Sequence, residues 1–86
     1  MNNVTRLERE IAKALGVTPN MLDVLRRINR GDGISGNNTG TALDARGLTV
    51  PPVVERTQWG GYWQTEPRKL TDAGRELLAR ARALGF

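Results

Sequence analysis

The sequence predicts a small α+β domain in which three helices are followed by a β-hairpin and a closing helix. This order is indicated by helix caps at Thr18 and Thr71 and by a Gly-Gly turn at residues 59–62 between strand-forming residues. A chain of 86 residues buries only about 60–65 % of its unfolded surface on folding. We therefore expect one domain, residues 1–86, with a small core.

The charge and the missing residue types narrow the function classes. The chain has 13 Lys and Arg residues against 9 Asp and Glu residues, a net charge of +4 that suits a polyanion such as nucleic acid. It has no Cys and no His, which removes thiolate chemistry and the commonest metal ligand and general base. We expect a non-enzymatic protein without a cofactor or a metal.

The sequence contains no candidate membrane segment. No apolar run approaches the roughly 20 residues that a spanning helix needs. The first residues, Met1 to Val4, lack the basic region and apolar stretch of a secretory leader. We expect a cytoplasmic protein with no membrane partner.

The first helix is expected over Val4–Leu15. Thr5 and Glu8 have the spacing of a capping box, and Gly16 ends the helix. Apolar residues recur at the spacing of one helical face, which we expect to pack on the core or on a second subunit. These residues are Val4, Leu7, Ile11 and Leu15.

The second helix begins at Thr18-Pro19, because Thr is a good cap and Pro loses nothing at the first helical position. Its expected buried stripe comprises Met21, Leu22, Leu25 and Ile28. A loop, Gly31–Asn38, follows, with Ile34 as its expected core anchor. The loop spells G-x-G-x-x-G, but it follows a helix in a chain too short for a dinucleotide-binding βαβ unit, so we reject that interpretation.

A third, short helix is expected over Thr39–Leu48. Thr39 is its predicted cap, Leu43 points inward, and Gly47 ends it, with Leu48 folding back as the apolar contact of a glycine-terminated helix. Two prolines follow at 51–52, and they should lie at a strand edge or a bend because they cannot donate a ladder hydrogen bond.

The hairpin is predicted to turn at Gly60-Gly61, a two-residue loop that sets Trp59 opposite Tyr62 at the tip. Trp63 falls on the other face, opposite Gln58, and we expect it to pack toward the body. The closing helix is capped by Thr71 and ends at Gly85. Its expected apolar stripe comprises Ala73, Leu77, Ala81 and Leu84, with Leu78 beside it.

Two short motifs carry a resemblance to a known family. They are Ala42-Leu43 with Arg46-Gly47-Leu48, and Leu70-Thr71 with Gly74 and Leu78. In order and separation they resemble the end of the recognition helix and the entry to the closing helix in winged-helix regulators of the bacterial multiple-antibiotic-resistance (MarR) and PadR families. The resemblance covers roughly Met21 to Leu84. Those families have a complete positioning helix where this chain has only Gly31–Asn38, so we expect that helix to be shortened or missing.

The resemblance implies a DNA-binding protein, such as a small transcriptional regulator or an accessory factor of a phage or mobile element. Double-stranded DNA is the expected partner, and the terminal helices are the expected dimer contact. Polar and cationic side chains on the short helix and the wing would contact the DNA. They are Asn38, Thr39, Thr41, Arg46, Arg56, Gln58, Arg68 and Lys69.

Two observations point away from DNA. Asp44 lies on the short helix and would face phosphate unless it pairs with Arg46 or accepts a hydrogen bond from a cytosine amine. Aromatic residues gather at the hairpin tip, where Trp59 and Tyr62 could contact a protein instead. The alternative function is therefore a protein-interaction module on the same fold that binds a host regulator or enzyme.

Overall fold

The computed structural model describes residues 5–31 and 38–86. The predicted anchor Ile34 and most of the predicted loop lie outside these residues. In the described ranges the elements are, in chain order, α1 (Arg6–Leu15), α2 (Pro19–Asn29), α3 (Asn38–Ala45), β1 (Thr49–Val50), β2 (Val53–Arg56), β3 (Tyr62–Glu66), β4 (Lys69–Leu70) and α4 (Asp72–Ala83). The predicted α+β class is confirmed, with helices before and after an antiparallel hairpin in the chain.

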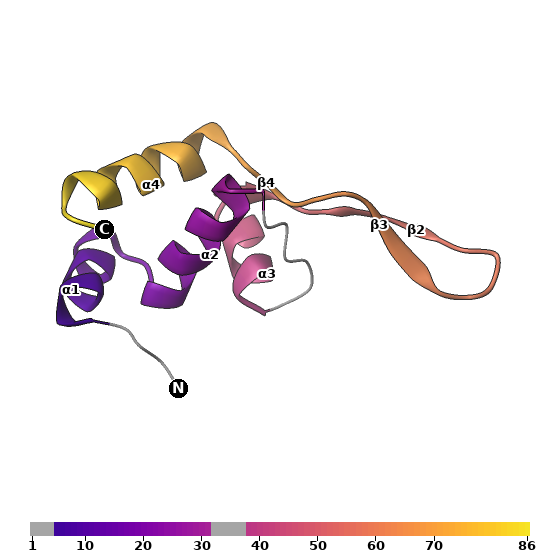
Figure 1. Ribbon diagram of the computed structural model, residues 1–86, viewed down its shortest axis with the longest axis horizontal. Coiled ribbons are helices and arrows are strands. Elements are labelled where there is room, and N and C mark those ends of the chain that lie inside the picture. The colour runs from indigo at the N-terminus through magenta and orange to yellow at the C-terminus, as the bar shows by residue number, and fades with distance from the viewer. Residues whose placement is uncertain (1–4, 32–37) are drawn as a thin grey trace.

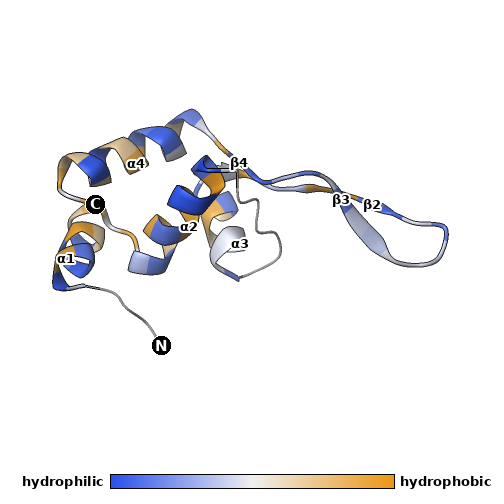
Figure 2. Ribbon diagram, in the orientation of Figure 1, coloured by the Kyte–Doolittle hydropathy of each residue, from blue (hydrophilic) through white to orange (hydrophobic). Residues whose placement is uncertain are grey.

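The helices gather into one body, and the β2–β3 hairpin extends from it (Figure 1). The longest dimension of the molecule is 47 Å, against 30 and 21 Å for the other two. Hydrophobic and hydrophilic segments alternate along α1, α2 and α4, as amphipathic helices require (Figure 2). The buried core lies within the body and comprises Ile11, Ala12, Met21, Leu22, Val24, Leu25, Ile28, Leu43, Leu70, Leu78 and Ala81.

Three of the four predicted helix caps are confirmed. The side chains of Thr5, Thr18 and Thr71 each accept a hydrogen bond from the backbone N–H three residues later, at 3.1 to 3.2 Å. Each bond satisfies an N–H that has no partner inside the helix. Gly16 ends α1 with a left-handed φ of 73°.

The end of α3 also forms as predicted. Gly47 has a φ of 73° and donates to the Asp44 carbonyl at 3.0 Å, and Leu48 donates to the Leu43 carbonyl at 3.0 Å. This pair of bonds is a Schellman motif, and Leu48 folds back against the core. The start of the helix differs from the prediction, because α3 begins at Asn38 and Thr39 lies inside its first turn.

The apolar stripes of the terminal helices are displaced from the predicted ones. Leu7 and Leu84 are each 50 % exposed. In α4 the buried positions are Gly74, Leu78 and Ala81, so the predicted burial of Ala81 is confirmed, whereas Leu77 is half-buried and Ala73 is exposed. The displacement follows from Gly74, which must face the backbone of Leu48 and so fixes the rotation of the helix.

The strands form two antiparallel ladders. In the first, β1 pairs with β4 and Thr49 faces Leu70; in the second, β2 pairs with β3. Pro51 and Pro52 separate β1 from β2, which confirms the predicted bend and follows from the absence of a proline N–H.

The register of the hairpin differs from the prediction. Arg56 pairs with Tyr62 and Glu55 pairs with Trp63, so Trp59 lies in the loop and does not face Tyr62. The predicted pairing of Trp63 with Gln58 is likewise wrong.

The turn chemistry explains this register. The Thr57 N–H donates to the Gly61 carbonyl at 2.7 Å, and the Gly60 N–H donates to the Thr57 carbonyl at 3.1 Å. Gly60 has a φ of 86°, whereas Gly61 does not have a positive φ. The loop is therefore a type I turn followed by one left-handed glycine, a three-residue connection that needs only one of the two glycines in that conformation.

Candidate functional site

A buried ion pair joins α3 to the start of β4. The Arg68 Nε and Nη2 atoms donate to Asp44 Oδ1 and Oδ2, each at 3.0 Å, in a bidentate arrangement. The side chains of Arg68 and Asp44 are only 4 % and 15 % exposed. The Thr49 hydroxyl, from β1, donates to the same carboxylate. These contacts fix the orientation of α3 relative to the first ladder.

Gly40 makes room for this pair. A Cβ atom at position 40 would lie 2.2 Å from Nη1 of Arg68, closer than any side chain tolerates. Glycine in a helix interior costs about 1 kcal/mol relative to alanine. The close approach of the guanidinium is a physical reason for a glycine in so short a helix.

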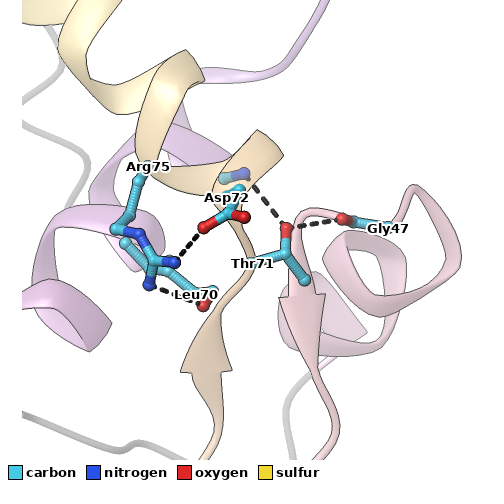
Figure 3. A network of polar contacts seen from close by, with 6 residues as sticks. Gly47, Leu70, Thr71, Asp72 and Arg75 are labelled. Carbon is cyan, nitrogen blue, oxygen red and sulfur yellow. Dashed lines mark hydrogen bonds and ion pairs between the residues drawn. The ribbon is translucent and has the colours of Figure 1, made fainter.

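A second set of contacts joins the end of α3 to the start of α4 (Figure 3). The Thr71 hydroxyl donates to the Gly47 carbonyl at 2.7 Å, and the Thr71 N–H donates to the Leu48 carbonyl at 3.1 Å. A Cβ atom at Gly74 would lie 2.0 Å from that Leu48 oxygen, so only glycine permits the approach. The two sequence motifs, separated by more than twenty residues, therefore meet in space.

We call these two sets of contacts together the hairpin base. It comprises Gly40, Asp44, Gly47, Leu48, Thr49, Arg68, Thr71 and Gly74. The Asp44–Arg68 pair and the two close glycine contacts were not predicted from the sequence. The available signal was a glycine inside each of two helical patterns, which often marks a close backbone or side-chain approach.

Most of the predicted DNA-contacting residues of α3 face outward. Asn38 and Thr41 are exposed, whereas Thr39 is half-buried. Arg46 is exposed, and its Nη1 donates to the Gly16 carbonyl at 2.8 Å, across to the end of α1.

The position of Arg68 corrects the predicted set of DNA-contacting residues. Its guanidinium is buried against Gly40 and holds Asp44, so it does not lie on the DNA-facing surface that the sequence suggests. Asp44 is thus neutralised by Arg68, and not by Arg46 as considered from the sequence. The neighbouring Lys69 is exposed.

The hairpin carries little positive charge. We call residues 53–66 the hairpin arm. The arm contains one cation, Arg56, and two carboxylates, Glu55 and Glu66, so its net charge is −1. Because the whole chain has a net charge of +4, the remaining residues have a net charge of +5. Arg56 and Gln58 are exposed. The arm is therefore a weaker phosphate-binding element than the resemblance implies.

The arm is rich in exposed apolar side chains. Trp59, Tyr62 and Trp63 are 86 %, 71 % and 62 % exposed, and Val53 and Val54 are exposed as well. The prediction that Trp63 packs toward the body is wrong, because the arm extends away from the helices (Figure 1). Trp59 and Tyr62 lie at or next to the tip, as predicted.

No family model, curated protein or solved structure matches this chain. Among the described helices, none combines the length and apolar character that a membrane span requires. In the described ranges, His, Cys, Asp and Glu residues do not gather in groups of three or more that could hold a metal ion.

Proposed function

We propose that this chain is a winged-helix DNA-binding protein in which the outer face of α3 contacts a groove of double-stranded DNA. The observation that carries the proposal is the inward position of Asp44. Its carboxylate is bound by Arg68 and Thr49, so the acid that would repel phosphate is neutralised within the hairpin base. The outer face then offers Asn38 and Thr41 as hydrogen-bonding groups.

The roles of the individual residues follow from their chemistry. Asn38 and Thr41 are suited to base edges or phosphate oxygens, and only base-edge contacts would confer sequence preference. Arg46 after the end of α3 and Lys69 on β4 supply cations for phosphate. Release of counterions would provide most of the affinity, which agrees with the +5 charge outside the arm. A role in transcription, as a small regulator or a phage accessory factor, belongs to the same proposal.

Fluorescence anisotropy with a labelled random-sequence duplex at about 50 and 200 mM salt tests this function. We expect binding at low salt that falls steeply at high salt. Arg46→Ala and Lys69→Ala should each weaken binding to all sequences and reduce the salt slope by about one. Arg9→Ala, an exposed cation on α1, is the matched control and should have a smaller effect. Absence of binding at both salt concentrations would contradict the proposal.

A second candidate function is a protein-interaction module. It is favoured by the exposed aromatic residues of an arm whose net charge is −1. The double variant Trp59→Ala, Tyr62→Ala separates the two functions. Loss of a protein partner with DNA binding unchanged would favour the interaction module, whereas unchanged partner binding would remove the arm tip from that function.

A further inference from the structure

The structure has two exposed apolar surfaces with complementary charge. One is the hairpin arm. The other is a groove of about 420 Å³ between α1 and α4, lined by Ala14, Leu15, Arg80, Ala83 and Leu84. Arg80 is the only charged residue of this lining, and the half-exposed Leu84 forms part of its rim. An acidic apolar arm and a cationic apolar groove are suited to each other.

The two surfaces lie at opposite ends of the molecule. Figure 1 shows the arm extending from one end of the body, whereas the ends of α1 and α4 that form the groove lie at the other. The arm of one chain therefore does not reach its own groove. Two chains in antiparallel orientation would each place an arm on the groove of the other.

We infer that a second copy of this chain is the partner of the arm, with the hairpin arm of each protomer docked in the α1–α4 groove of the other. A reciprocal exchange of this kind closes on itself with twofold symmetry, so it produces a dimer and not a filament. It also covers both apolar surfaces with residues from the same sequence.

The register of the hairpin indicates which face docks. Trp63 and Glu55 are directly paired, so an indole and a carboxylate share one face of the arm. In the docked arrangement Trp63 fills the apolar part of the groove beside Leu84, and Glu55 meets Arg80. Buried tryptophan and tyrosine side chains are common centres of binding energy at interfaces.

At their observed exposures, the three aromatic side chains of one arm offer roughly 300–550 Å², since such side chains bury about 150–250 Å² each. Tyr62 and Trp63 are neighbours in β3 and point to opposite faces, so one docked face buries only part of this area. The two reciprocal contacts therefore form an interface smaller than the roughly 800 Å² per partner of a standard one, which predicts a monomer–dimer equilibrium that depends on protein concentration.

Sedimentation velocity of the full chain without DNA, over a range of protein concentrations, tests the inference independently of the proposed function. The wild-type protein should show a monomer–dimer equilibrium. Trp63→Ser removes the arm contact and Leu84→Glu removes the groove contact, and each variant alone should be monomeric. An equimolar mixture should form a heterodimer, because one intact arm still meets one intact groove.

Charge reversal identifies the contacting pair. Glu55→Arg and Arg80→Glu should each weaken dimerisation about tenfold, and the double variant should recover most of the loss. Arg9→Glu, on the exposed side of α1, changes the net charge in the same way as Arg80→Glu and should leave the dimer intact. All substituted positions are exposed, and circular dichroism would verify that each variant is folded.

Three results would overturn the inference. They are a wild-type monomer at all concentrations, sensitivity to the arm substitutions alone, and sensitivity to the groove substitutions alone. The second would indicate pairing of two arms, and the third would indicate a helix-to-helix dimer.

Discussion

The hairpin base and the hairpin arm belong to one continuous hairpin but are stabilised in different ways. At the base, a buried bidentate ion pair and close contacts at Gly40 and Gly74 hold the chain against α3 and α4. The described contacts of the arm lie within the arm itself: its ladder hydrogen bonds, the bonds of its turn, and a bond from the Thr65 hydroxyl to the Val53 carbonyl at 3.2 Å. Its large side chains are exposed. An isolated two-stranded hairpin is marginally stable in water.

The difference separates residues that maintain the fold from residues that are available for binding. Polar residues at the base, such as Arg68, are used for internal contacts although their residue type suggests a ligand. Apolar residues of the arm, such as Trp63, are exposed although their residue type suggests a core. Residue type alone would therefore assign the base to binding and the arm to the core, the reverse of what the structure shows.

The largest expected contrast is between two arginines. Arg68→Ala leaves the largely buried Asp44 carboxylate without its cation, and we expect a loss of about 3–5 kcal/mol in the free energy of unfolding. Arg56→Ala, on the exposed arm, should change it by less than about 0.5 kcal/mol. Urea unfolding followed by circular dichroism measures both, and equal effects would remove the distinction between base and arm.

Two glycines give the next contrast. Gly74→Ala places a Cβ atom against the Leu48 carbonyl, and we expect it to destabilise the fold by about 1–3 kcal/mol although alanine normally favours a helix. At Gly61 a Cβ atom would meet nothing closer than 3.5 Å, so Gly61→Ala should be nearly neutral. A stabilising effect of Gly74→Ala in thermal unfolding would show that α4 does not approach Leu48 so closely.

Two threonines give a smaller contrast. Thr71→Ala removes the α4 cap and the bond to the Gly47 carbonyl, which should cost about 1–2 kcal/mol. Thr57→Ala removes the side-chain bonds to Gly61 in the arm turn and should leave global stability within about 0.5 kcal/mol. A larger effect at Thr57 than at Thr71, measured by chemical unfolding, would contradict the account.

The smallest expected effect concerns the exposed aromatics. In dilute solution Trp63→Ala should change the stability of the monomer by less than about 0.5 kcal/mol, because the indole makes few contacts with the body. Leu43→Ala, at a fully buried site, is the comparison and should cost about 2–5 kcal/mol. Tryptophan fluorescence should report solvent-exposed indoles at low protein concentration, and a buried signal there would contradict the position of the arm.

The sequence predicted the features that depend on local chemistry. The three threonine caps, the Gly47 helix end and the Pro51-Pro52 bend are each specified by residues within a few positions of one another. These signals were sufficient for the order of the helices and the hairpin. The short β1–β4 ladder was not predicted, and α3 begins one residue earlier than expected.

Features that depend on distant residues were missed. The Asp44–Arg68 pair joins positions 24 apart, and nothing local to either residue indicates the other. The displaced stripe of α4 follows from the contact of Gly74 with Leu48, again a tertiary constraint. The predicted register of the hairpin was wrong because a Gly-Gly pair is compatible with two kinds of loop. A two-residue loop can have both glycines in the left-handed region, whereas the three-residue loop observed here has only Gly60 in that region.

Amide hydrogen exchange of the dilute monomer compares the stability of the hairpin base with that of the hairpin arm. We expect slow exchange at the hairpin base, where the Leu48 and Thr71 amides should open only with global unfolding, and much faster exchange across β2 and β3. Equal protection of the arm and the base in the monomer would contradict this expectation, because the arm would then be supported by contacts that this structure does not contain.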